Sequence, residues 1–175
     1  MIHVSSLSGL GRVAAALPAF DLLTLLSPSA EAQDWRDLAQ ARHLRLAFHD
    51  IAMPTPDLIA PDEGALQAIL DFGRACVPER PLLIHCWAGI SRSSAAAYVI
   101  ACDRNPGFED AIADELRRRS PVVTPNRLMV QLADDLLGRD GAMVAAIARI
   151  GRGADAFEGT PYQLSLKWPL ASSEP

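Results

Sequence analysis

A cysteine and an arginine separated by five residues carry the clearest chemical signal in this 175-residue chain. They lie in the segment His85-Cys86-Trp87-Ala88-Gly89-Ile90-Ser91-Arg92-Ser93. A short apolar run, residues 81–84, leads into this segment, and an uncharged stretch, residues 93–102, follows it. The pattern predicts a buried strand, a tight loop and a buried helix. Such a loop gathers backbone N–H groups at a helix N-terminus, so we expect it to bind an anion.

The side chains at the two ends of this loop suit displacement at phosphorus. Cys86 opens the loop, where the positive field favours the thiolate and makes the sulfur a competent nucleophile. Arg92 closes the loop, and its planar guanidinium can hold two phosphate oxygens at once and stabilise the charge that develops on them during displacement. Ser93 can donate a hydrogen bond to the sulfur and ease its departure. His85 is expected to fix the loop by hydrogen bonding.

The interior of the loop is expected to bind phosphate through its backbone, together with Arg92. Gly89 stands where the chain must approach an oxyanion closely or adopt a positive φ, and Ala88 keeps the neighbouring position narrow. Trp87 could stack on an aromatic leaving group, but the sequence favours packing against neighbouring loops. The phosphate-binding residues predicted in this way are Trp87, Ala88, Gly89, Ile90, Ser91 and Arg92.

An alkoxide or phenoxide leaving group needs a proton donor, which the loop does not supply. Asp50 is the best candidate because it follows a predicted strand and opens a proline-rich loop that could close over a substrate. Asp57 and Asp62 remain alternatives, since sequence does not decide which carboxylate points inward.

Strands and helices that would position these groups can be placed along the whole chain. Strands are predicted at residues 1–7, 21–26, 43–48, 81–84 and 162–166. Helices are predicted at residues 14–16, 31–41, 93–102, 109–119, 124–137 and 140–150, and one more begins at Pro61. Thr124 is the expected cap of the helix at 124–137, with Pro125 in its first turn. The alternation predicts an α/β fold in which residues 1–170 form one domain and residues 171–175 a loose tail.

Composition and charge exclude several classes of protein. A net charge of −5 argues against a nucleic-acid binder. Arg12, Pro18 and Asp21 interrupt the apolar residues 9–26, so no membrane helix or signal peptide is expected. Three cysteines without metal-site spacing favour neither disulfides nor zinc, which fits a reducing cytoplasm. The other two, Cys76 and Cys102, fall on apolar positions and are expected in the core, the alternative being a resolving partner for oxidised Cys86.

The pattern His-Cys-x5-Arg-Ser resembles the protein tyrosine phosphatase superfamily, and Ala-Gly-Ile-Ser-Arg-Ser is most similar to its dual-specificity branch. Residues 48–51 resemble the segment that carries the general acid of that branch. Residues 119–132, with Pro125-Asn126 and Gln131-Leu132, resemble the helix that follows the phosphate loop. The resemblance covers about residues 43–137.

This resemblance implies a mostly parallel central sheet flanked by helices and a two-step reaction without metal or cofactor. Cys86 would take the phosphoryl group while Asp50 protonates the leaving oxygen, and Asp50 would then activate water. The implied partner is a phosphorylated protein or a small phosphoester, with no nucleic acid and no membrane. The Trp-Pro-Asp and tyrosine-recognition motifs of the receptor-type and non-receptor tyrosine phosphatases are missing, so a deep pocket for phosphotyrosine alone is not supported. The loop interior lacks the basic residues of phosphoinositide phosphatases, so inositol lipids are disfavoured.

Two other functions stay open at this stage. The loop could bind phosphorylated ligands without turnover if no acid reaches it. The cysteine could also serve an arsenate reductase or a rhodanese-like sulfurtransferase, although the five-residue spacing and the mid-chain position favour phosphate chemistry. The oligomeric state is not predicted.

Overall fold

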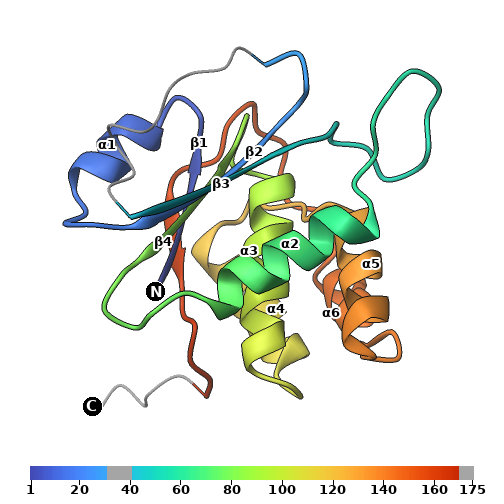
Figure 1. The fold of residues 1–175 in the computed structure, drawn as a ribbon. Helices are drawn as coiled ribbons and strands as arrows, with labels where there is room; N and C mark the ends of the chain where they lie inside the picture. Colours follow the sequence, from blue (N-terminus) through green and yellow to red (C-terminus); the bar gives the residue numbers. More distant parts are fainter. Residues whose placement is uncertain (31–40, 170–175) are drawn as a thin grey trace.

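The computed structural model describes residues 1–30 and 41–169, which form a mixed five-stranded sheet with helices on both faces (Figure 1). The strand order is β3-β2-β4-β1-β5, with only β5 antiparallel to its neighbour. The strands are β1 (Ile2–Ser6), β2 (Asp21–Leu26), β3 (Arg42–Ala47), β4 (Leu82–Cys86) and β5 (Tyr162–Leu164). The predicted α/β class and mostly parallel sheet are therefore confirmed. The helix predicted at residues 31–41 falls almost wholly, and the tail at 171–175 wholly, outside the described residues.

Six helices in the described residues cover the sheet unequally. They are α1 (Leu10–Ala15), α2 (Glu63–Arg74), α3 (Arg92–Arg104), α4 (Glu109–Arg119), α5 (Arg127–Leu137) and α6 (Ala142–Ile150). α1 lies on one face of the sheet, and the other five helices lie on the opposite face (Figure 1). Successive side chains of β2 point to opposite faces of the sheet. Leu22 packs with Leu10 beneath α1, and Leu23 belongs to the larger core on the other face.

The helix α3 is enclosed by the rest of the larger layer. Every residue from Arg92 to Cys102 is buried, and α3 contacts β1 and β4 as well as α2, α4 and α5. A helix in that position has no face for charged side chains, which explains the uncharged stretch in the sequence. The prediction of a helix buried on all sides is confirmed.

Several predicted boundaries were wrong by a few residues. α1 begins at Leu10 rather than residue 14, and β4 continues through Cys86 because its ladder with β1 pairs Ser6 with Cys86. Pro61 precedes α2, which is capped by Asp62. Thr124 is not the cap of α5. Asn126 caps that helix by accepting from Met129 N at 3.0 Å, because Thr124 Oγ1 accepts instead from Gly153 N at 3.1 Å.

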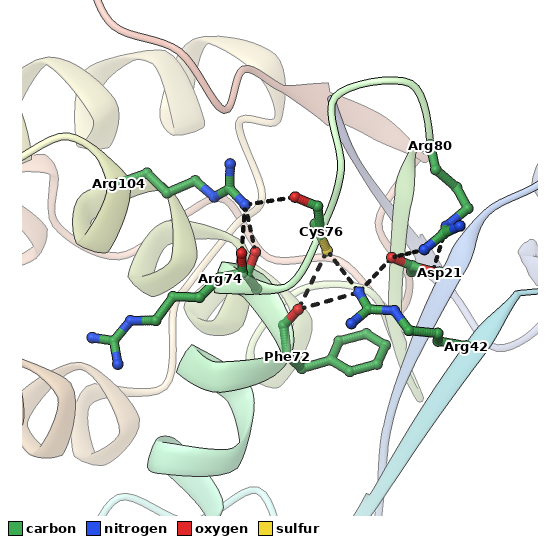
Figure 2. Close-up of polar contacts among 8 residues, drawn as sticks. Asp21, Arg42, Phe72, Arg74, Cys76, Arg80 and Arg104 are labelled. Atoms are coloured by element: carbon green, nitrogen blue, oxygen red, sulfur yellow. Dashed lines mark hydrogen bonds and ion pairs between the residues drawn. The ribbon is translucent and has the colours of Figure 1, made fainter.

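A buried ion cluster fixes the amino ends of the parallel strands (Figure 2). Asp21, fully buried at the start of β2, accepts from Arg42 Nη2 at 2.5 Å and from Arg80 Nε at 2.7 Å. Burial alone would raise the pKa of Asp21, but hydrogen bonds from both arginines outweigh it and lower that pKa. Arg42 also lies 4.6 Å from the Phe72 ring centroid, so the cluster ties β2 and β3 to the end of α2.

Cys76 belongs to this end of the sheet, far from Cys86. Its sulfur lies 3.5 Å from Arg42 Nη2. Cys86 lies at the opposite end of β4, a strand that spans about 13 Å from Leu82 to Cys86. Cys102 lies ten residues into α3, about 15 Å along the helix from Arg92. Burial raises the pKa of both thiols above the ordinary value. Neither can reach Cys86 to form a disulfide without large movement, so both are core residues.

Candidate active site

The carboxyl ends of the four parallel strands converge on one pocket. Cys86 ends the central strand β4 between Ser6 at the end of β1 and Ser27 just beyond β2, and Phe48 follows β3. The pocket has a volume of about 640 Å³, and its lining includes Cys86, Arg92 and Asp50. Ligands of open α/β sheets bind at this edge, where strand order reverses. The topology therefore brings together three side chains that are up to 42 residues apart.

The loop between Cys86 and Arg92 turns its carbonyl groups away from the pocket. Four of these carbonyls accept hydrogen bonds from backbone amides of other segments: Trp87 from Leu7 at 3.0 Å, Ala88 from Gly159 at 2.8 Å, Ile90 from Thr124 at 3.1 Å and Ser91 from Asn126 at 3.4 Å. In a trans peptide the C=O and the next N–H point in opposite directions. The N–H groups that follow these carbonyls are therefore directed into the loop, where an oxyanion can accept from them.

Gly89 lies at the tightest point of this loop. Its φ is +71°, and a Cβ at this position would lie 2.8 Å from Ser6 N and 2.9 Å from the Ser5 carbonyl carbon. Both atoms are backbone, so no side-chain movement could relieve the contact. The Gly89 amide donates to Cys86 Sγ at 3.3 Å. The predicted need for glycine has two physical reasons here, the backbone conformation and the close approach to β1.

The sulfur of Cys86 is buried at the floor of the pocket, with the residue 2% exposed. Ser93 Oγ lies 3.1 Å from Sγ, within hydrogen-bonding distance. The sulfur therefore lies within hydrogen-bonding distance of one hydroxyl and accepts a hydrogen bond from one backbone amide.

Arg92 is held rigidly and still has donors free for a ligand. Its Nη1 donates to the Phe48 carbonyl at 2.7 Å and to Ser27 Oγ at 3.3 Å. Its Nε is buried without a hydrogen-bond partner among the described residues, and lies 3.9 Å from Asp50 Oδ2. A buried guanidinium N–H without an acceptor is costly unless a ligand satisfies it. The fork is thus oriented from β2 and β3 and open toward the pocket.

Asp50 is positioned by two hydrogen bonds from different segments. Its Oδ1 accepts from Ser91 Oγ at 2.7 Å and from Asn126 Nδ2 at 2.8 Å. Asn126 Nδ2 also donates to the Ile51 carbonyl at 3.1 Å, so one amide holds both the carboxylate and its backbone. The other carboxylate oxygen of Asp50, Oδ2, faces Arg92 and the pocket. In the sequence, Asn126 stands out only as part of residues 119–132, which resemble the helix after the phosphate loop, and nothing there indicates a contact with Asp50.

The other two candidate acids lie elsewhere. Asp62 caps α2 by accepting from Ala65 N at 2.8 Å. Asp57, with a φ of +62°, is exposed in the loop after Asp50. Neither lines the pocket. His49 closes this loop, since its backbone N donates to the Ile59 carbonyl at 2.7 Å and its Nδ1 accepts from Ile59 N at 2.9 Å.

His85 supports the phosphate loop from the face of the sheet that α1 covers. Its Nε2 shares a hydrogen bond of 2.8 Å with Thr24 Oγ1, and Thr24 also bonds His43 Nε2 at 2.9 Å. The pKa of His85 is lowered to about 4, mainly by burial. The neighbouring His43 also lowers this pKa, and the hydrogen bond with the Cys86 backbone raises it by a smaller amount. A neutral His85 therefore links β4 to β2 directly beneath the nucleophile.

Comparison with solved structures identifies the fold. Tk-PTP in its active form is 25% identical, with 75% of this chain and 86% of that chain covered and a TM-score of 0.51. PTPMT1 in complex with PI(5)P is 12% identical, with coverages of 82% and 94% and a TM-score of 0.59. The Yvh1 phosphatase domain from Chaetomium thermophilum is 17% identical, with coverages of 81% and 93% and a TM-score of 0.56. The chain has the protein tyrosine phosphatase fold. No protein-family model and no curated protein matches its sequence.

Within this phosphatase fold, Trp87 does not pack against neighbouring loops as the sequence favoured. Its side chain is 59% exposed and lines the rim of the pocket. Phe157, from the segment between α6 and β5, lines the same rim and is 89% exposed. The Trp87 carbonyl accepts a hydrogen bond from Leu7 N at 3.0 Å, which fixes the backbone of this residue. Phe157 had no sequence signal, because its place at the pocket depends on a fold-back of 65 residues or more.

The described part of the chain offers neither a cluster of metal ligands nor a helix that could span a membrane. No group of three or more His, Cys, Asp or Glu side chains within residues 1–30 and 41–169 is arranged to hold a metal ion. Each helix in the described part of the chain is too short or too polar to cross a bilayer.

The buried neutral His85 should make stability sensitive to acid. Its pKa in the folded phosphatase is about 4 against an ordinary value of 6.5, so the unfolded chain binds the extra proton first as the pH falls. The contribution of His85 to the free energy of unfolding is fully present above about pH 6.5 and is lost as the pH falls to about 4. We expect His85 to account for a loss of roughly 2 kcal/mol between pH 7 and pH 4.5. Urea unfolding of the parent and of His85→Gln at both pH values measures it. Equal losses in the two proteins would contradict the prediction.

The sequence predicts Asp50 as the proton donor, so replacement of Asp50 or of Asn126, which holds it, is expected to slow hydrolysis most for poor leaving groups. Asp50→Asn is expected to lower kcat for phenyl phosphate roughly 100-fold, and Asn126→Ala roughly 10-fold. The losses should be smaller for p-nitrophenyl phosphate, because p-nitrophenolate leaves more readily without a proton. Asp57→Asn, which removes an exposed carboxylate of the same loop, should stay within about twofold of the parent. Equal losses on both substrates would indicate a structural effect and not a defect in proton transfer.

Proposed function

We propose that this chain is a cysteine-dependent phosphatase of the dual-specificity type that hydrolyses phosphotyrosine or related phosphomonoesters. The observation that carries the proposal is the convergence on one pocket of the Cys86 sulfur, the inward loop amides and Arg92 Nε, which has no hydrogen-bond partner among the described residues. Each of these groups favours a dianionic, tetrahedral ligand. The similarity to solved phosphatases, 25% identical in the case of Tk-PTP, supports the same conclusion.

The proposed first step transfers the phosphoryl group to sulfur. Cys86 Sγ attacks phosphorus in line with the leaving oxygen, the P–O bond breaks, and protonated Asp50 gives its proton to that oxygen. The loop amides and Arg92 hold the three equatorial oxygens as charge develops on them. Asn126 and Ser91 keep the acid at the mouth of the pocket.

The proposed second step releases phosphate. Water attacks the phosphocysteine, Asp50, now ionised, accepts a proton from it, and the S–P bond breaks. The thiolate that departs is stabilised by Ser93 Oγ and by the Gly89 amide. The cycle uses no metal and no cofactor.

The lining of the pocket supports a substrate with a single phosphate group. Arg92 is the one cation among the described lining residues, and Trp87, Ile90 and Phe157 give the entrance an apolar, aromatic character. PTPMT1 is solved with PI(5)P, but a lipid headgroup with further phosphate groups would meet no second cation among the described lining residues. A phosphorylated protein or a small aryl phosphoester fits better. Three free cysteines are consistent with action in the cytoplasm.

Arsenate reduction and sulfur transfer are less well supported. Reduction of arsenate by a thiol needs a second thiol to take over the oxidised sulfur. Cys76 lies at the far end of the parallel strands, and Cys102 lies about 15 Å along α3 from Arg92. A dedicated phosphate-binding module would have no use for an acid held by two hydrogen bonds beside the bound anion.

Release of p-nitrophenol from its phosphate ester tests the proposal. The parent is expected to turn over in the presence of excess EDTA, with kcat unchanged by added divalent cations. Activity that requires a metal would overturn the mechanism. An inactive parent that still binds inorganic phosphate in calorimetry would support the binding module instead.

A further inference from the structure

A second pocket adjoins the phosphate pocket. It has a volume of about 300 Å³ and is lined by Leu7, Ser8, Trp87, Ala88, Phe157 and Glu158. Three of these residues, Trp87, Ala88 and Phe157, also line the phosphate pocket. The two pockets therefore share a wall, and a substrate held at Cys86 has its neighbouring groups beside the second pocket.

The backbone of residues 157–159 is fixed against the phosphate loop. Gly159 N donates to the Ala88 carbonyl at 2.8 Å. Gly159 is buried, and a Cβ there would lie 3.1 Å from the Gly89 carbonyl oxygen, so only a small residue permits this approach. Phe157 and Glu158 are consequently held at the second pocket by the same contact that shapes the phosphate loop.

Glu158 presents a fixed negative charge in this pocket. Its Oε1 accepts hydrogen bonds from the hydroxyl groups of Ser6 and Ser8, and Oε2 has no hydrogen-bond partner among the described residues. The hydrogen bonds from Ser6 and then Ser8 lower the pKa of Glu158, so it is ionised at neutral pH. No salt bridge to Glu158 is formed within residues 1–30 and 41–169, although the charge of Arg12 also lowers the pKa of Glu158.

The two aromatic side chains complete an environment suited to a cation. Trp87 is 59% exposed and Phe157 is 89% exposed, and both border the pocket that contains Glu158. A guanidinium or ammonium group is attracted by aromatic faces and pairs with a carboxylate. An acidic or neutral side chain would gain neither contact.

We propose that this second pocket is a specificity subsite that binds an arginine or lysine side chain close to the phosphorylated residue of a protein substrate. The proposal rests on the proposed function, because the phosphate pocket must hold the phosphorylated residue. Glu158 supplies the carboxylate, and Trp87 and Phe157 supply the aromatic walls. Since neighbouring residues of an extended peptide are 3.8 Å apart, the cation belongs within about two residues of the phosphotyrosine.

A set of phosphotyrosine peptides tests the subsite directly. One arginine is placed at each of the positions −2, −1, +1 and +2 of an otherwise alanine and glycine peptide, and glutamate replaces it in a matched set. Turnover is measured with the parent, and binding is measured by fluorescence anisotropy with Cys86→Ser. We expect one arginine position to raise kcat/KM and to tighten binding roughly 10-fold over glutamate.

Three variants separate a contact at the subsite from a general effect of charge. Glu158→Gln keeps an acceptor for Ser6 and Ser8 but removes the charge, and should reduce the preference to within about twofold. Glu158→Arg should reverse it in favour of glutamate. Asp155→Asn removes an exposed carboxylate three residues away that pairs with Arg152 and lines neither pocket, and should keep the preference.

The outcomes distinguish the subsite from the proposed function. Turnover without any preference, or a preference that survives Glu158→Gln, overturns the subsite and leaves the phosphatase intact. Absence of turnover with a Glu158-dependent binding preference overturns the phosphatase and supports the subsite. Absence of both turnover and binding overturns both.

Discussion

Replacement of Cys86 by serine is expected to lower kcat for p-nitrophenyl phosphate by at least roughly 10⁴-fold. The serine hydroxyl would occupy the same position at the floor of the pocket, but it is not ionised near neutral pH and so is a poor nucleophile. The loop amides and Arg92 are untouched, so inorganic phosphate should bind within about threefold of the parent. Initial rates and calorimetry, at matched protein concentration, measure the two quantities.

Cys76→Ser is the matched control for this experiment. It makes the same chemical change in a buried cysteine at the other end of the sheet, and kcat should remain within about threefold. A Cys86→Ser protein that keeps more than about one hundredth of the parent activity would show that another group attacks phosphorus. Loss of phosphate binding along with activity would indicate that the loop had collapsed.

Arg92→Lys should cost roughly 10³-fold in kcat/KM although the charge is kept. Lysine is a point donor on a flexible stem, whereas the guanidinium presents a planar fork to two oxygens at once. Lysine could not at the same time donate to the Phe48 carbonyl and reach the phosphate, because a single ammonium would have to serve both. The fork of Arg92 makes the first contact at 2.7 Å with Nη1 while its Nε stays available.

The control for Arg92→Lys is Arg74→Lys, an exposed arginine on α2 that pairs with Asp103. Its kcat/KM should lie within about twofold of the parent. Thermal unfolding of both variants shows whether the fold is preserved. If Arg92→Lys retained kcat/KM within about tenfold, the fork would not be the clamp, and the loop amides would have to carry the oxyanion alone.

The local parts of this molecule could be predicted from the sequence. Residues 81–102 read as strand, tight loop and buried helix because each state depends on neighbours in the chain: an apolar run, a glycine and an uncharged stretch. The spacing of Cys86 and Arg92 by itself implied one anion between them. The sequence also indicates Asp50, because this residue follows a predicted strand and opens a proline-rich loop that could close over a substrate.

Boundaries were less predictable where two residues could serve equally well. Thr124 and Asn126 are both good helix caps, and the local sequence favoured Thr124. The tertiary structure decided for Asn126, because Thr124 is engaged with Ile90 and Gly153. The same choice brings Asn126 to Asp50, so one cap residue also orients the proposed acid.

The sequence by itself thus determined the strand, loop and helix around Cys86 and the residue types that could act on phosphate. Only the tertiary structure decided what surrounds them: Thr24 beneath His85, Asn126 on Asp50, and Phe157 and Glu158 beside the pocket. These contacts join residues 61 to 152 positions apart. They depend on the order of strands in the sheet and on the path of the chain after α6, and no period or spacing along the sequence encodes either one.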